Sequence, residues 1–121
     1  MPTKYAIVLM APESTPDGRG RLLHAYTTAI DLYKTGAAVE FYFDGIGVEN
    51  ITAFDDKENP FSQHYVYLFE QVLPFAKACG VCARHFKADR AADNLNIELV
   101  SSENHRSLAQ FMLEGYNVVT F

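Results

Sequence analysis

The sequence predicts an α/β fold in which a five-stranded parallel sheet lies between two layers of helices. Apolar runs of strand length alternate with segments whose apolar residues recur every three or four positions. The first run, residues 5–10, is continuously apolar, as expected for a strand buried on both faces. At 121 residues, 49% of them hydrophobic, the chain is long enough and apolar enough for one domain, spanning 1–121.

A loop and a long helix are expected after the first strand. Residues 11–20 are dense in turn formers and predict a surface loop. From about Arg21 to Tyr33, apolar residues recur at helical spacing, and Gly36 is a natural C-terminal stop for that helix. Residues 38–43 are again apolar and form the second predicted strand.

The middle of the chain has a less regular pattern. Residues 47–51 are ambiguous and fit a helical turn, whereas 55–60 predict an exposed loop. Residues 62–73 have a strand-like composition but keep helical spacing, so the sequence favours a helix that is closed by the following proline. A short third strand, 75–78, then runs directly into a cysteine.

The last part of the chain supplies two more helices and two more strands. A short helix is expected over 80–88, and residues 96–100 form the fourth strand. Ser102 is a suitable cap for a helix over 104–114, and residues 117–121 are the last strand. Five strands that alternate with helices give a three-layer α/β/α sandwich.

Charge and composition argue against two classes of partner. The formal net charge is −5 and the ten basic residues are scattered, so no cationic stripe is available for nucleic acid. The first apolar run is too short to span a bilayer, and no signal-peptide cleavage pattern follows it. We therefore expect a cytoplasmic protein, in which the two cysteines are thiols rather than a structural disulfide.

Cys79 is the first candidate catalytic residue. It follows the third strand, and ligands of open parallel sheets gather outside the carboxyl ends of strands. The helix that starts at Gly80 would direct amide donors and its positive dipole end at the sulfur, which favours the thiolate. Gly80, Val81, Arg84 and His85 are accordingly the candidate substrate- or anion-binding residues. The alternative is that Cys79 is a small buried hydrophobic residue.

Cys82 completes a Cys-x-x-Cys motif with Cys79 and is the second candidate catalytic residue. Such a motif suggests dithiol redox chemistry, but it follows the third strand and no aromatic residue precedes it, which argues against a thioredoxin-like site. Cys79, Cys82 and His85 are also spaced by threes, as metal ligands can be. Only Asp89 or His105 could complete such a set, so we predict neither a metal nor a cofactor.

The segment 17–21 is a weaker candidate. It opens the first helix and has amides that could hold a phosphate, but it lacks the phosphate-loop lysine and the dinucleotide fingerprint. We predict a surface loop there. The histidines outside the cysteine motif stand alone, and no Ser–His–Asp arrangement is visible.

With these residues in view, the chain resembles the DsrE/DsrF-like family, which includes the sulfur-relay subunits of the DsrE and TusD type. The resemblance is carried, in order along the chain, by residues 5–10, 23–36, 39–48, 78–83 and 113–121. It implies a DsrEFH-like five-stranded sheet, assembly into dimers, trimers or hexamers, and a persulfide carried by the cysteine after the third strand. That position corresponds to Cys79.

Two features depart from the family pattern. Many relatives have an Arg-Gly pair near the end of the short helix, where this chain has Phe86 and Lys87. Residues 49–64 also form a longer connection, which bears on the substrate and the partner but leaves the cysteine in place.

The sequence thus supports one leading hypothesis and two alternatives. The first is a sulfur-relay protein with Cys79 as persulfide acceptor, Cys82 as a candidate resolving thiol, and sulfur donor and acceptor proteins as partners. The second is a non-catalytic oligomeric module that binds a small ligand or a partner. The third is a Cys79/Cys82 dithiol redox protein. The apolar residues of 65–75 fit either self-association or a well-buried crossover helix.

Overall fold

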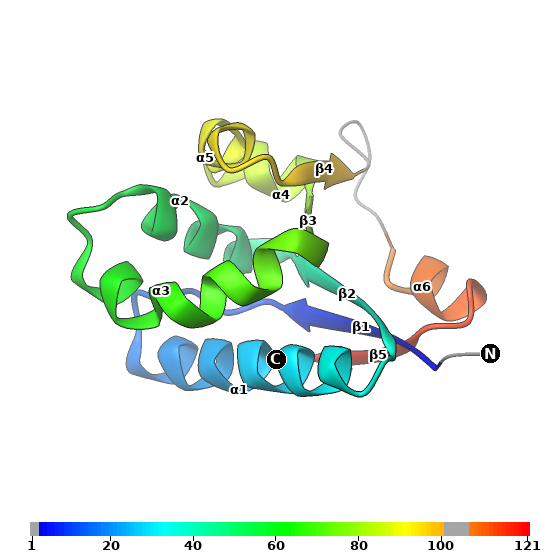
Figure 1. Cartoon of the computed structure of the whole chain (residues 1–121). Helices are drawn as coiled ribbons and strands as arrows, with labels where there is room; N and C mark the ends of the chain where they lie inside the picture. Colours follow the sequence, from blue (N-terminus) through cyan, green and yellow to red (C-terminus); the bar gives the residue numbers. More distant parts are fainter. Residues whose placement is uncertain (1–2, 101–106) are drawn as a thin grey trace.

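Five parallel strands form a single sheet in the order β4-β3-β2-β1-β5 in the structure, a computed structural model (Figure 1). The structure describes residues 3–100 and 107–121. The strands are β1 (Lys4–Leu9), β2 (Ala38–Phe43), β3 (Ala76–Cys79), β4 (Glu98–Val100) and β5 (Asn117–Thr120). With its helical layers, this sheet makes the α/β sandwich that the sequence predicts.

Helical segments make every connection that the structure describes in full between successive strands, since parallel strands need a crossover. The α-helices are α1 (Pro16–Lys34), α2 (Glu49–Asp55), α3 (Pro60–Val72), α4 (Gly80–His85), α5 (Asp89–Asn94) and α6 (Ala109–Leu113). Two 3₁₀ helices, η1 (Gly45–Val48) and η2 (Leu73–Phe75), follow β2 and precede β3. Of the described helices, none is long and apolar enough to cross a bilayer.

The larger core lies between the sheet and the helices α1 and α3. Because side chains alternate along a strand, Phe41 and Phe43 of β2 both point into this core. Tyr26 of α1 lies 5.3 Å from the Phe41 ring, measured between ring centroids. Phe69 of α3 stacks on Phe54 of α2 at 4.0 Å, which ties the two helices to the same core.

A smaller apolar cluster occupies the other face of the sheet. Its fully buried members include Val8, Tyr42, Cys79 and Phe111. Phe111 comes from α6 and meets the Tyr42 ring edge to face, with the centroids 5.2 Å apart. Among the described residues this second helical layer consists of the five-residue α6 and is much thinner than the first (Figure 1).

Loop residues 11–15 and the segment after β2 are held together by one buried amide. Asn50 of α2 is 3% exposed. Its Nδ2 donates to the carbonyl oxygens of Ala11 and Gly47, at 2.8 Å each. Gly47 also packs against the Leu9 carbonyl so closely that a Cβ would overlap it. These contacts fix the carboxyl ends of β1 and β2 relative to each other.

The first helix begins five residues earlier than predicted, at Pro16 rather than Arg21. Thr15 is its N-cap, and the Thr15 Oγ1 accepts a hydrogen bond from the Gly18 amide at 2.9 Å. Proline suits the first helical turn and threonine suits the cap, so residues that predicted a loop instead start the helix. The prediction of a surface loop over 17–21 is therefore wrong, because these residues lie in α1.

Other boundaries also differ from the predictions. The ambiguous segment 47–51 is helical, and it contributes to both η1 and α2. The helix expected over 80–88 ends at His85 as α4, because Lys87 adopts a positive φ of 59°, and α5 from Asp89 is a further helix that was not predicted. Asn96 is likewise left-handed, with a φ of 57°, so β4 starts two residues later than predicted.

The helix favoured over 62–73 is confirmed as α3. Most of its apolar side chains beyond residue 62 pack on the core, although Tyr67 is 72% exposed. This packing accounts for part of its apolar composition, and the self-association that the composition also fits stays a prediction. Of the predicted helix 104–114, the described residues 107–114 contain α6, which begins at Ala109. The predicted cap Ser102, the beginning of the predicted helix 104–114, and His105 lie outside the described residues.

Replacing Gly47 by alanine is expected to lower the free energy of unfolding by about 1–3 kcal/mol, because the new methyl group meets the backbone at Leu9. Gly20, on α1, has open space around it, so Gly20→Ala is the matched control and should raise stability by roughly 0.5–1 kcal/mol. Urea unfolding measures both. Equal stability for the two variants would contradict the close approach at Gly47.

Candidate functional site

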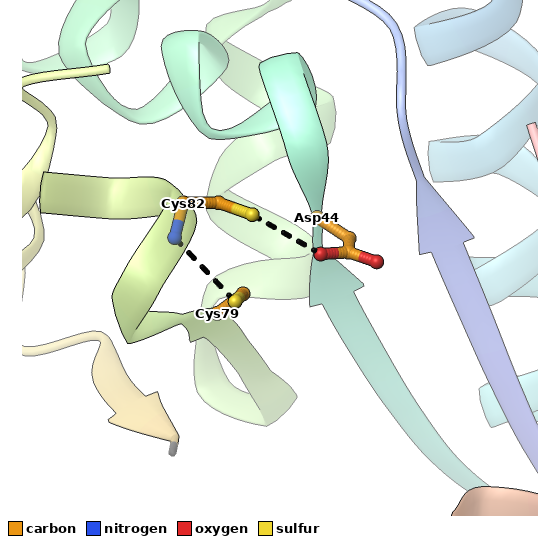
Figure 2. Close-up of side chains that lie close together, drawn as sticks. All are labelled: Asp44, Cys79 and Cys82. Atoms are coloured by element: carbon orange, nitrogen blue, oxygen red, sulfur yellow. Dashed lines mark hydrogen bonds between the residues drawn. The ribbon is translucent and has the colours of Figure 1, made fainter. Parts of the chain in front are cut away.

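Two polar side chains meet where the neighbouring strands β2 and β3 end. The strands pair in parallel with Phe43 opposite Ala78. Asp44 and Cys79 each come one residue later, so the register brings them side by side at the carboxyl edge of the sheet (Figure 2). This edge is where open parallel sheets carry their ligands and reactive groups.

Cys79 is the N-cap of α4, as its predicted position at a helix start requires. Its backbone is extended, with φ −68° and ψ 119°, and its Sγ accepts a hydrogen bond from the Cys82 amide at 3.5 Å. An amide dipole is therefore directed at the sulfur. The expected solvent access is not seen, however: Cys79 is 0% exposed in this single chain because it is packed in the smaller apolar cluster.

Asp44 is the site residue that was not predicted. It caps η1 by accepting the Gly45 amide on Oδ1 at 2.9 Å, and it is only 1% exposed. The Cys82 thiol donates to the same Oδ1 at 3.6 Å (Figure 2). One signal in the sequence could have identified it, because an acidic residue directly after one buried strand lies at the same edge as a cysteine after the next.

The environment keeps Cys82 protonated. Burial raises the pKa of its thiol to about 12, and the hydrogen bond with Cys79 and the charge of Asp44 act in the same direction, whereas the Gly45 amide opposes them. A thiol that donates to a carboxylate must hold its proton, so the hydrogen bond and the raised pKa agree. The two cysteines thus have different roles: Cys82 is a proton donor, whereas the Cys79 sulfur is an acceptor.

The other predicted site residues are not all brought to the sulfur. Gly80 is buried and Val81 is half-buried in the first turn of α4, beside Cys79. Arg84 and His85 are exposed in the last turn of the same helix, at its opposite end. There they suit the negative end of the helix dipole, and they do not form an anion site around Cys79.

The residue spacing also suggested His85 and Asp89 as partners of the cysteines. Within the part of the chain that the structure describes, the group that comes together is Asp44, Cys79 and Cys82, whose ligand atoms lie within 4.8 Å of one another. His85 and Asp89 are both exposed outside this group. The residue that the fold places beside the two cysteines is therefore Asp44, which follows the neighbouring strand β2, and not His85, which the spacing suggested.

Comparison with known proteins supports the fold. No family model matches the sequence, and no curated protein matches it. A solved structure of a conserved protein of unknown function from Bacteroides thetaiotaomicron is similar, with a TM-score of 0.65 and 14% identity, covering 98% of this chain and 94% of that chain. Identity this low shows the fold alone. The resemblance to the sulfur-relay family thus stays a prediction.

The raised pKa of Cys82 predicts how stability depends on pH. In the unfolded chain the thiol titrates near its ordinary value of 9.0, but in the folded protein it holds its proton up to about 12. Above pH 9.0 the unfolded state therefore loses this proton first, and stability falls as the pH rises toward about 12. Cys82→Ser keeps a hydroxyl donor for Asp44 but does not titrate, so the decline should be shallower in the variant.

Urea unfolding of both proteins at several pH values between about 8 and 11 measures this difference. Equal slopes in the two proteins would show that Cys82 keeps an ordinary pKa in the folded state.

Proposed function

We propose that this protein is a sulfur carrier that accepts a persulfide sulfur on Cys79. The observation that supports this most directly is the asymmetry of the two cysteines at the end of β3. The Cys79 sulfur accepts the Cys82 amide, whereas the Cys82 thiol keeps its proton and directs it toward Asp44. Sulfur transfer needs one nucleophilic sulfur and no neighbouring thiolate that would attack the sulfur once it is loaded.

The transfer can be written with balanced bonds. The Cys79 thiolate attacks the outer sulfur of a donor persulfide, R–S–SH, so an S–S bond forms at Cys79 while the donor S–S bond breaks. The donor leaves as the thiolate RS⁻, and Cys79 holds the sulfur as S–SH, with no external oxidant or reductant. An acceptor thiolate then attacks the outer sulfur, and Cys79 leaves as the thiolate.

The protonated state of Cys82 protects the loaded sulfur in this scheme. As a thiolate it would attack the inner sulfur of the Cys79 persulfide, forming a Cys79–Cys82 disulfide and releasing HS⁻. The raised pKa of Cys82 keeps its thiolate population small, and the Cys82 thiol proton is held in the hydrogen bond to Asp44. The loaded sulfur is therefore kept for the acceptor. Cys82 acts as a resolving thiol only when that hydrogen bond is broken.

Access to Cys79 requires a partner that displaces part of the covering cluster. Phe111 of α6 belongs to that cluster, and the next two residues of α6 expose apolar side chains: Met112 is 60% exposed and Leu113 is 86% exposed. A donor, an acceptor or a second copy of the chain that docks on these side chains would act on the cluster to which both Phe111 and Cys79 belong. Donor and acceptor proteins and a homo-oligomer therefore remain the proposed partners.

Dithiol redox chemistry is the second candidate, because the two sulfurs lie within 4.8 Å of each other. Forming the disulfide would require both protons to leave and an oxidant to take two electrons. The raised pKa of Cys82 disfavours the first of these steps.

Incubation with a low-molecular-weight persulfide should add one sulfur atom to Cys79, as detected by mass spectrometry of the intact protein and its peptides. Cys79→Ser should abolish the gain. Cys82→Ser is the matched control, and it should load as much sulfur as the wild type and retain it as long, because the protonated Cys82 of the wild type does not release it as HS⁻.

Equal uptake by Cys79→Ser would refute the assignment of the acceptor. No uptake by the wild type, even with mild denaturant to loosen the apolar cluster that contains Cys79, would favour a packed and inert Cys79 in a binding module. Disulfide formation with no persulfide intermediate would favour the redox alternative.

A further inference from the structure

We propose that Asp44, Cys79 and Cys82 form a zinc site with an open fourth position. Three potential ligand atoms, two sulfurs and one carboxylate oxygen, lie within 4.8 Å of one another. They come from the ends of two neighbouring strands and the first turn of α4 (Figure 2). Zinc accepts thiolate and carboxylate ligands together, and three protein ligands with one open position are typical of its reactive sites.

The geometry fits a tetrahedral ion. With Zn–S bonds of about 2.3 Å and Zn–O bonds of about 2.0–2.2 Å, tetrahedral angles put a sulfur and an oxygen about 3.5 Å apart and two sulfurs about 3.8 Å apart. The Cys82 Sγ lies 3.6 Å from the Asp44 Oδ1, close to the first of these separations. All three ligand separations are below 4.8 Å, so small side-chain rotations are enough to bind an ion.

The surroundings also orient the ligands. The Cys82 amide donates to the Cys79 sulfur, and the Gly45 amide donates to the Asp44 carboxylate. Hydrogen bonds of this kind hold metal ligands in place and are compatible with a bound ion, because each sulfur or oxygen has further lone pairs. Asp44 and Cys79 are buried, whereas Cys82 is half-buried.

This inference does not depend on sulfur transfer, although the two would interact. An ion bound to the Cys79 sulfur would withdraw electron density from it and make it a weaker nucleophile toward a persulfide. Zinc and sulfur would therefore compete for the same atom, and loading would be slower while the ion is bound.

Cobalt(II) substitution provides the test, because it reports thiolate ligands by charge-transfer absorption and tetrahedral geometry by its d–d bands. Titration of the reduced wild type should give both signals at one ion per chain, and zinc should displace them. Asp44→Asn keeps the shape and the acceptor for the Gly45 amide but should raise the Kd for cobalt at least roughly tenfold. Cys79→Ser and Cys82→Ser should each weaken the charge-transfer band.

Two control variants remove the ligands that residue spacing suggested. Asp89→Asn matches the charge change of Asp44→Asn at an exposed position, and His85→Ala removes the nearby imidazole. Both should bind cobalt as the wild type does. Unchanged binding in Asp44→Asn, or lost binding in His85→Ala, would overturn the proposed ligand set, as would a wild type that gives no thiolate signal.

X-ray absorption of the zinc-loaded wild type decides the case if Asp44→Asn does not fold. Two sulfur scatterers at about 2.3 Å and oxygen at about 2.0–2.2 Å support the site, whereas the outer-shell scattering of an imidazole contradicts it.

Sulfur loading of the metal-free Asp44→Asn protein separates the two proposals. Loading without cobalt binding supports both assignments, and cobalt binding by a wild type that cannot be loaded supports the metal site alone.

Discussion

The parallel pairing of β2 with β3 is the constraint on which the candidate site depends. It places Phe43 opposite Ala78, and the next residues, Asp44 and Cys79, therefore meet although 35 positions separate them in the sequence. A shift of one residue in this register would turn one of the two side chains to the opposite face of the sheet. Asn50 reinforces the same edge, because its buried amide links the segments that follow β1 and β2.

Burial gives the two cysteines their different chemistry. In water, thiols separated by two residues would titrate alike. In the folded chain, one sulfur faces an amide donor and the other faces a carboxylate, and the low polarity of the site strengthens both interactions. The result is a pair in which Cys82 holds its proton and Cys79 can accept one hydrogen bond without competing for that proton. Sequence motifs alone cannot distinguish these roles.

Much of the fold was predictable because its signals are local. The alternation of apolar runs with helical periodicity gave the sheet, and α3 was recognisable from its spacing despite a strand-like composition. Two helix boundaries could not be predicted. The start of α1 at Pro16 is rich in turn formers and therefore resembles a loop, and nothing in the sequence indicates the left-handed backbone of Lys87 that follows α4. Cys79 was placed correctly at the end of β3, but Asp44 was missed because its role depends on which strands are neighbours.

The burial of Cys79 is compatible with both an inert and a reactive sulfur, and its neighbours distinguish the two. A cysteine that serves only as a small apolar residue needs no polar atom near it. Here a carboxylate with 1% exposure and a second thiol lie beside the sulfur, and burying such a carboxylate costs free energy unless hydrogen bonds compensate. Asp44 has such hydrogen bonds, because its Oδ1 accepts the Gly45 amide and the Cys82 thiol while it caps η1. The Cys79 sulfur therefore lies beside polar, hydrogen-bonded groups, and this setting supports the proposal of a reactive sulfur over that of a packed one.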